Sequence, residues 1–225
     1  MIIDEKLEKE SAREYALRVI RKNIVELQLI PGAKVSENEL AAEMGISRTP
    51  VREALIDLSK NGIVEIYPQR GSYISLIDRK SVDDAHFVRI AMECAAVKEV
   101  CSLVTDGQIN ALASNIRMQQ TCVDNQNYHR LLHLDDEFHY MLFEIADKAQ
   151  AYDFLKTLML YFDRVRRLQM QALDRQFVVD DHRNILRAIE TRDTVKAQQM
   201  MYDHLQHYSF DWEKLIRRFP NYFRK

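Results

Sequence analysis

The sequence predicts a mainly α-helical chain in two parts, a winged helix-turn-helix followed by an all-α bundle. Of five glycines and four prolines, only Gly107 and Pro220 lie beyond residue 72. Since both residue types disfavour helix interiors, the first third should consist of short elements and the rest of long helices. We therefore expect one domain over residues 1–76, a linker over 77–80 and a second domain over 81–225. In the second domain apolar residues recur at helical intervals in six segments: 81–104, 107–125, 127–147, 150–173, 178–191 and 193–216.

Three short helices are expected in the first domain. Apolar residues at intervals of four, four and three predict the first over residues 11–28: Ala16, Ile20, Ile24 and Leu27. Ser36 and Glu39 have the S-x-x-E spacing of a capping box, which indicates a second helix over residues 37–44. Because proline is favoured at the first position of a helix, the proline that follows Ser-Arg-Thr predicts a third helix over residues 50–60.

A β-hairpin is expected after the third helix. Two runs rich in β-branched and aromatic residues, 63–67 and 72–76, flank the turn sequence PQRG. The tip of this hairpin is expected to place Arg70 and Gly71 on the outside. Three helices followed by a hairpin make up a winged helix-turn-helix.

The start of the third helix carries residues suited to DNA. A helix that enters the major groove needs long cationic donors near its N-terminus, where it approaches base edges and phosphates most closely. Arg48, Thr49 and Arg52 meet that requirement. The alternative is that they are ordinary solvated side chains. The net charge of -2, from 32 basic and 34 acidic residues, gives no overall sign of nucleic-acid binding, so any basic surface must be local.

The stretch PGAKVSENELAAEMGISRTPVREALIDLSKNGIVEIYPQRGSYIS resembles the N-terminal domain of the GntR family of bacterial transcription regulators. The resemblance implies DNA binding by three residues near the recognition helix and by two residues of the wing that reach the minor groove: Arg48, Thr49, Arg52, Arg70 and Gly71. One departure is Asn38, where the family often has arginine after Glu37. A common cationic contact is therefore absent, and the operator sequence is expected to differ from the family's better-known ones.

An aspartate and three histidines interrupt apolar faces of the later helices. Asp135 and His139 lie four residues apart on one stripe of segment 127–147, so they can chelate one ion, whereas an unpaired buried carboxylate would be costly. His182 and His204 also align with apolar residues, and the four suggest an Asp-His-His-His metal site in the bundle core. The alternative is that each is a hydrogen-bonded core residue. Three other histidines share their faces with polar residues and are expected at the surface: His129, His133 and His207.

The segments LDDEFHYMLFEIA, DDHRNILRAIETRD and MMYDHLQHY resemble the metal-binding helices of the FCD effector domain, found in the FadR-like subgroup of the GntR family. The resemblance implies an FCD-type bundle in which a divalent ion is bound by Asp135, His139, His182 and His204. Imidazole and carboxylate ligands suit zinc, the ion we expect, and also nickel, iron or manganese. The segment IADKAQAYDFL departs from the family, which usually has Gly-Asn after the metal helix, so the pocket rim there is expected to differ.

The resemblance also implies a small organic acid as effector, bound at open positions of the ion. Arg89 matches a position where the subgroup often carries an arginine, and its planar guanidinium suits a carboxylate. The alternative is that Arg89 is a surface arginine paired with Glu93, four residues further on.

These features together predict a transcription regulator and not an enzyme. We expect a homodimeric repressor that binds a pseudo-palindromic double-stranded operator and releases it when the acid binds. Two alternatives remain, that the metal itself is the signal, or that the chain is a metal-dependent hydrolase. No general base is evident beside the site, which argues against hydrolysis.

Other classes are disfavoured by what the sequence lacks. It contains neither GxGxxG nor GxxxxGK[ST], which disfavours common nucleotide-binding enzymes. Three cysteines without CxxC spacing suggest neither a disulfide framework nor a thiolate zinc site. No apolar run approaches the roughly 18 residues of a membrane-spanning helix, and the acidic start is unlike a signal peptide, so a cytoplasmic location and no membrane partner are expected.

Overall fold

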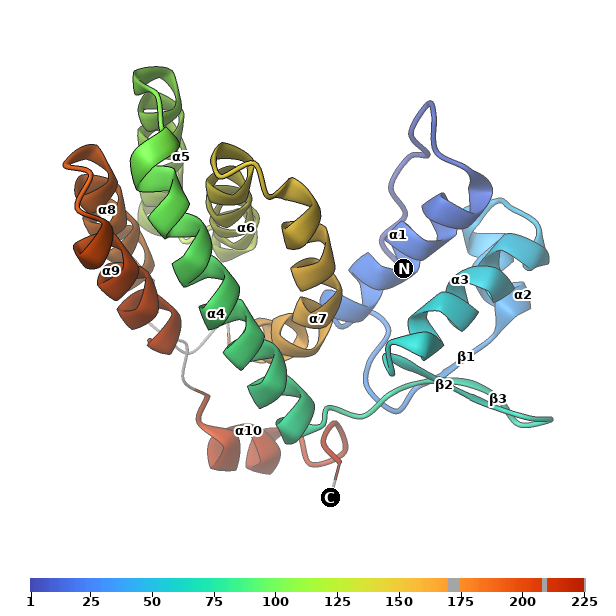
Figure 1. Cartoon of the computed structure of the whole chain (residues 1–225). Coiled ribbons are helices and arrows are strands. Elements are labelled where there is room, and N and C mark those ends of the chain that lie inside the picture. Colours follow the sequence, from blue (N-terminus) through green and yellow to red (C-terminus); the bar gives the residue numbers. More distant parts are fainter. Residues whose placement is uncertain (170–174, 208–209, 225) are drawn as a thin grey trace. The chain divides into compact units, whose positions relative to one another are not determined.

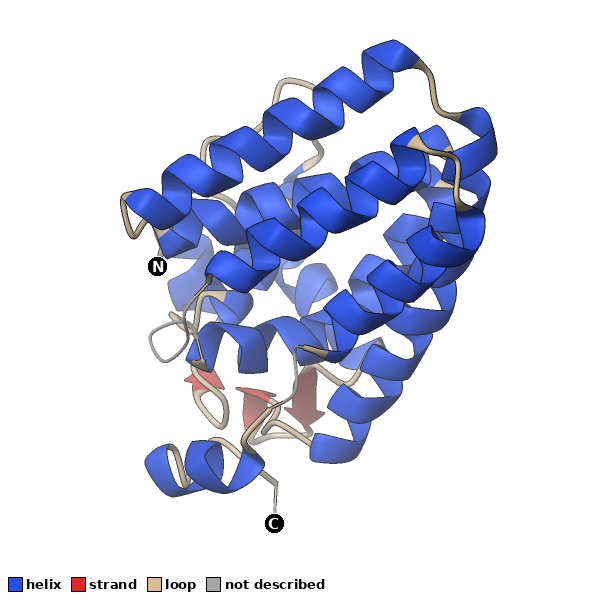
Figure 2. Cartoon of the chain, turned by 90° about the vertical axis from the view of Figure 1, so that its left-hand side faces the viewer, coloured by secondary structure: helices blue, strands red, loops and turns tan. Residues whose placement is uncertain are grey.

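The computed structural model describes residues 1–169, 175–207 and 210–224 of the 225-residue chain. Helices make up most of it, and the strands are confined to one small sheet (Figures 1 and 2). The winged helix-turn-helix consists of α1 (Ala12–Val25), β1 (Lys34–Val35), α2 (Glu37–Met44), α3 (Arg48–Lys60), β2 (Val64–Tyr67) and β3 (Gly71–Ile74). The helices that follow are α4 (Arg79–Leu103), α5 (Asp106–Asp124), α6 (Tyr128–Ile145), α7 (Ala149–Leu168), α8 (Gln176–Glu190), α9 (Thr194–Gln206) and α10 (Trp212–Arg218). The predicted mainly α-helical fold is confirmed.

The described chain divides into two compact units. The first contains residues 1–85, 157–169 and 210–224, and the second contains residues 86–156 and 175–207. Two helices, α4 and α7, have residues in both units. The predicted division into residues 1–76, 77–80 and 81–225 concerns the functions of the parts and not their compactness. It stays a prediction.

Local signals explain where α2 and α3 begin and end. The amide N–H of Glu39 donates to Ser36 Oγ (3.4 Å), which satisfies one free donor at the start of α2. Gly45 ends this helix with φ of 65°, a conformation that glycine adopts without steric cost. The third helix begins at Arg48, two residues before Pro50, so the predicted start was wrong. Proline has no N–H to lose within the first turn, so the helix can begin before it.

The hairpin is the wing, and a strand absent from the predictions extends it. The sheet has the order β1-β3-β2 with antiparallel neighbours, and Tyr67 pairs with Gly71. Gly71 is therefore the first residue of β3, and not part of the tip. Strand β1 has only two residues, too few to show the alternation by which a strand is recognised in a sequence.

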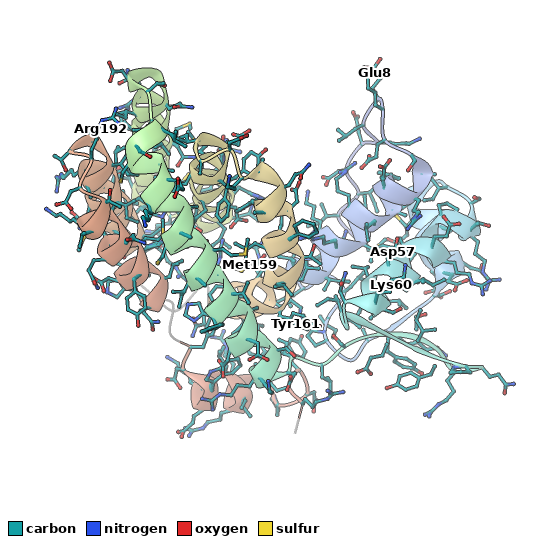
Figure 3. All side chains as sticks on the ribbon, viewed as in Figure 1. Glu8, Asp57, Lys60, Met159, Tyr161 and Arg192 are labelled. Atoms are coloured by element: carbon teal, nitrogen blue, oxygen red, sulfur yellow. The ribbon has the colours of Figure 1, made fainter. Side chains whose placement is uncertain are left out.

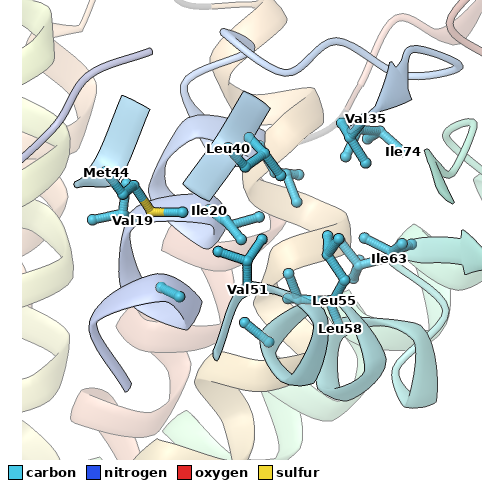
Figure 4. Packing of buried hydrophobic residues seen from close by; sticks show 14 of the residues in the cluster. Val19, Ile20, Val35, Leu40, Met44, Val51, Leu55, Leu58, Ile63 and Ile74 are labelled. Atoms are coloured by element: carbon cyan, nitrogen blue, oxygen red, sulfur yellow. The ribbon is translucent and has the colours of Figure 1, made fainter. Parts of the chain in front are cut away.

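The core of the first unit brings α1, α2 and α3 together over the sheet. Figure 4 shows Ile20 of α1, Leu40 of α2 and Leu55 of α3 directed toward one another. Each is almost completely buried. Ala16, Ile20 and Ile24 of the predicted stripe therefore form the face that holds the three helices together, whereas Leu27 lies beyond the end of α1.

We expect Ser36→Ala to destabilise the first unit by about 1 kcal/mol, because it removes the acceptor for the Glu39 N–H at the start of α2. Urea unfolding followed by circular dichroism measures this change. Ser36→Asp keeps an N-cap acceptor and should remain within a few tenths of a kcal/mol of wild type. Equal midpoints for wild type and Ser36→Ala would contradict the assignment.

Packing between helices builds the second unit. Helix α5 packs against α6 and α8, and α8 packs against α9. The segment 193–216 is two helices instead of the one predicted, because Asp211 is not helical and its side chain caps α10 by accepting from the Lys214 N–H at 3.0 Å. The predicted segment 150–173 is helical to Leu168, and residues 170–174 lie outside the described part. None of the described helices has the length and apolar character needed to cross a bilayer.

Candidate nucleic-acid interface and metal centre

The candidate DNA-reading residues lie on the first turns of α3. Arg48, Thr49 and Arg52 are all exposed. Arg48 Nε donates to Glu37 Oε2 of α2 at 2.5 Å. The N-cap residue Ser47 makes no side-chain hydrogen bond to the helix start. The N–H groups of this turn can therefore receive a phosphate, together with the positive end of the helix dipole.

The wing adds further cationic groups. The Arg70 guanidinium lies 5.9 Å from the centre of the Tyr67 ring, and both side chains are exposed. Gly71 has φ of 101°, and a Cβ there would lie 3.0 Å from Lys34 Cε. The backbone conformation of the hairpin and the close approach of Lys34 therefore explain why glycine occupies position 71. Lys34, on the strand that the sequence did not reveal, is exposed beside Gly71 and is a candidate phosphate contact that sequence reasoning missed.

Three helices of the second unit bring the four candidate metal ligands together. Asp135 and His139 come from α6, His182 from α8 and His204 from α9. All four side chains are buried, and their ligand atoms lie within 4.8 Å of one another. His129 and His133 are exposed, as their faces predicted, and the side chain of His207 is 53% exposed.

A side-chain oxygen lies close to Nδ1 of each of the three histidines. His139 Nδ1 contacts Glu93 Oε2 of α4, and His182 Nδ1 lies 2.8 Å from Gln119 Oε1 of α5. His204 Nδ1 lies 3.3 Å from Asp181 Oδ2, which also accepts from His207 Nδ1 at 2.8 Å. Because carboxylate and amide oxygens only accept hydrogen bonds, the partners of His182 and His204 assign the ring proton to Nδ1, so that Nε2 of each ring carries the lone pair.

The orientation of the Gln119 amide is set by its own partners. Its Nε2 donates to Asn115 Oδ1 at 2.6 Å and to the Leu134 carbonyl at 3.3 Å, so Oε1 must be the atom that faces His182. The His182 ring also stacks on Phe138, with 4.0 Å between ring centres. The ring is therefore held on one face and at one edge.

The three Nε2 atoms converge. His204 Nε2 lies 3.2 Å from Nε2 of His182 and 3.2 Å from Nε2 of His139, and Asp135 Oδ1 lies 3.7 Å from His182 Nε2. Burial is the main cause that lowers the pKa of both His182 and His204, so their neutral forms are favoured. Neutral rings of His182 and His204 with Nδ1 protonated present their Nε2 lone pairs to each other, which is unfavourable unless a cation lies between them. The donor set fits a divalent ion.

Arg89 is buried beside this cluster, not on the surface. Its Nε donates to Glu93 Oε1 at 2.6 Å, and the other oxygen of Glu93 contacts His139 Nδ1. Burial would raise the pKa of Glu93, but Arg89 and His139 hold it well below its usual range, so it is ionised. The predicted alternative was correct about the pairing with Glu93 and wrong about the location. A chain of contacts therefore joins Arg89 to a candidate metal ligand.

We expect Glu93→Gln to weaken metal binding about tenfold. Loss of a partner that orients a ligating histidine typically costs 10- to 100-fold in affinity, and glutamine retains one oxygen that can accept from His139, which favours the lower end. Competition with a fluorescent zinc chelator measures the effect. Glu99→Gln, an exposed change on the same helix, should leave the affinity unaltered, and equal affinities for Glu93→Gln and wild type would be evidence against this role.

The sequence does not reveal which side chains contact the three histidines. Glu93 shares with Arg89 the i, i+4 spacing of an ordinary helix-surface ion pair. Gln119 lies 63 residues before His182, and Asp181 lies 23 residues before His204. Their role depends on helix packing, which no local pattern reveals.

Comparisons with known proteins agree on one family. Residues 14–74 match the family described as bacterial regulatory proteins, gntR family, and residues 84–207 match the FCD domain. The HTH-type transcriptional repressor RspR of Escherichia coli is 35% identical over 193 residues, which cover 85% of this chain and 85% of that protein. An uncharacterized HTH-type transcriptional regulator of Streptomyces ambofaciens is 32% identical over 206 residues, which cover 91% of this chain and 86% of that protein.

Solved structures share the fold at low identity. The Escherichia coli protein McbR/YncC superposes with a TM-score of 0.80 at 16% identity, covering 93% of this chain and 99% of that one. A putative transcriptional regulator GntR from a Rhodococcus species gives a TM-score of 0.70 at 19% identity, covering 91% of this chain and 97% of that one. At these identities the likeness concerns the fold alone.

Proposed function

This chain belongs to the GntR family of DNA-binding transcriptional regulators with an FCD domain, and from that premise we propose that it is a repressor controlled by a small organic acid at a metal site. In this proposal residues 1–76 form the domain that binds the operator, and residues 81–225 form the domain that binds the acid. Residues 77–80 are the linker between the two domains. Repression is supported by the relative that is named a transcriptional repressor. The hydrolase alternative has no support, because the family and the relatives are regulators and not enzymes.

The convergence of the three histidine Nε2 atoms carries the proposal. Asp135, His139, His182 and His204 would hold a divalent ion, zinc in our assignment, and such an ion supplies a Lewis-acidic centre to which a carboxylate can bind. Four protein ligands leave room on an ion that accepts five or six. Arg89, joined through Glu93 to His139, supplies a cationic group for the same acid.

In the DNA-binding half, Arg48, Thr49 and Arg52 enter the major groove. The wing reaches the minor groove through Arg70 and Gly71, and Lys34 beside it contacts a phosphate. One recognition helix reads one half-site, so a pseudo-palindromic operator requires a homodimer. Sedimentation of the zinc-loaded chain with and without DNA tests that state, and a single monomeric species bound to a palindromic duplex would refute it.

The function is tested with a duplex that the full-length, zinc-loaded chain selects from a random pool. Small mono-, di- and hydroxycarboxylic acids are added and DNA affinity is followed by fluorescence anisotropy. We expect at least one acid to weaken binding, its neutral amide to have no effect, and Arg89→Gln to lose the response while it retains DNA binding. A response to zinc removal alone, with none to any acid, would favour the metal as the signal.

A further inference from the structure

Helix α7 has one end in each compact unit. Residues 149–156 belong to the unit with the metal cluster, and residues 157–168 belong to the unit with the winged helix-turn-helix. The helix is continuous over Ala149–Leu168. When one end of a continuous helix is displaced, the other end moves with it. The elements that contact the two ends of α7 are therefore the ones that this helix can couple.

At its C-terminal end α7 contacts the end of the recognition helix. The Tyr161 hydroxyl donates to the carbonyl of Asn61, which is the C-cap of α3. Figure 3 labels Tyr161 and also Lys60, the last residue of that helix. The next residue, Gly62, has φ of 66°, and a Cβ there would lie 2.6 Å from Tyr161 Oη. The absence of a side chain at Gly62 is what allows this approach.

One turn further, α7 contacts the end of the wing. Arg164 is completely buried, and its Nη1 donates to the Ser75 carbonyl at 2.8 Å and to Ser75 Oγ at 3.4 Å. The Ser75 N–H donates to the Ile63 carbonyl at 2.9 Å, so this residue joins the two strands' outer ends. Within the described chain, Arg164 Nε and Nη2 are buried without a hydrogen-bond partner, and burial lowers its pKa to about 10. A buried guanidinium with two unsatisfied donors lowers the stability of the folded chain. A contribution to stability therefore does not explain why an arginine occupies this position.

At its N-terminal end α7 contacts the metal helix. The Tyr152 hydroxyl donates to the Asp136 carbonyl of α6 at 3.0 Å, and its ring lies 5.2 Å from that of Phe143. Asp136 directly follows the candidate ligand Asp135. This hydrogen bond therefore joins α7 to the main chain of α6 next to a candidate metal ligand.

We propose that Tyr161 and Arg164 are positioning residues for DNA binding, and that α7 is the element through which the effector domain acts on the winged helix. The route, though not the positioning, rests on the proposed function. Both side chains hold backbone carbonyls, one at the end of α3 and one at the end of β3. They therefore set the main chain of the recognition helix and the wing, and Arg164, being buried, cannot itself contact DNA.

The positioning is tested with full-length Tyr161→Phe and Arg164→Met on the selected duplex. We expect each to lower DNA affinity by about tenfold, within the range of coupling seen between sites in proteins. Hydrogen exchange of the amides of residues 72–77 should accelerate. Arg164→Lys keeps one donor for Ser75 and should recover part of the affinity, which a loss of general stability would not produce.

Arg192→Met is the matched control. Arg192 also donates to backbone carbonyls, those of Cys101 at 2.8 Å and Val104 at 3.1 Å, but in the second unit. Its DNA affinity should stay within about twofold of wild type. If Tyr161→Phe and the folded Arg164 variants bind DNA as the control does, with unchanged exchange at residues 72–77, the positioning role is overturned. Tyr161→Phe, which removes one oxygen, decides the matter if Arg164→Met does not fold.

The route is tested with zinc alone as the probe. The ratio of DNA affinities with and without zinc is measured for wild type, Tyr152→Phe and Tyr161→Phe. We expect a ratio different from one in wild type and close to one in both variants, with zinc affinity retained. A wild-type ratio that survives in both variants overturns α7 as the route. A wild-type ratio of one contradicts metal-dependent control instead, and the positioning role is then decided by DNA affinity and exchange alone.

Discussion

Zinc will raise the melting temperature of the wild-type chain by about 8–16 °C, and His182→Ala will lose nearly all of this increase. With free zinc about 1,000-fold above the dissociation constant, binding adds about 4 kcal/mol to stability. In a chain of this size, 1 kcal/mol corresponds to about 2–4 °C. The gain is expected because the Nε2 atoms of three buried histidines converge, with His204 Nε2 3.2 Å from those of His182 and His139, which is a donor set that a cation stabilises. Scanning calorimetry with and without zinc measures it.

The comparison must be of the zinc-dependent increase and not of absolute stability. Loss of the His182 ring also leaves a cavity against Phe138, which destabilises the chain with or without metal. His129→Ala is the control, because His129 is exposed on α6 and its ring lies against that of exposed His133, 4.8 Å away between ring centres. It should retain the full increase. If His182→Ala retains it and His129→Ala does not, zinc binds at the surface pair and the buried cluster is no metal site.

The four clustered side chains could be foreseen because helical spacing reports which face of a helix is buried. Asp135 and His139 share a stripe with leucines, and a buried carboxylate needs a partner. The same reasoning could have placed Gln119 on the buried face of α5 with Leu112, Ile116 and Cys122, but helical spacing cannot say which histidine it contacts. Nor could it identify Asp181 as the partner of His204. Their roles arise only when α5 packs against α8 and α8 against α9.

Spacing also fails to say what a buried face packs against. The predicted segment 150–173 was assigned whole to the effector domain, yet residues 157–169 pack in the same compact unit as the winged helix-turn-helix. Leu160 belongs to the core formed by α1, α2 and α3. The burial of Arg164 was the hardest to predict, because an arginine on a helix is ordinarily exposed. The residues next to it in the sequence do not indicate that its side chain is completely buried.

Arg52→Ala will lose about 1–3 kcal/mol of affinity for the selected duplex, or roughly 5- to 150-fold, if Arg52 is bidentate to a guanine. Arg52 is exposed on the second turn of α3. No ion pair holds it within the described chain, whereas Arg48 would first have to leave Glu37, 2.5 Å away. Arg52 is therefore the arginine whose contact with a base is least opposed. Lys60→Ala is the control, since Lys60 is paired with Asp57 at the other end of the same helix, about 12 Å along its axis.

The salt dependence decides what kind of contact Arg52 makes. If the side chain reads a base, Arg52→Ala relaxes specificity at one position of the duplex and leaves the slope of log affinity against log salt almost unchanged. If it binds a phosphate, the same substitution weakens binding equally for all sequences and reduces that slope by about one. Affinities for the selected duplex and for its single-base variants, measured at several salt concentrations, separate the two. Equal affinity of Arg52→Ala and wild type for every duplex would remove Arg52 from the interface, and the exposed Arg48, freed from Glu37, would then have to read the operator.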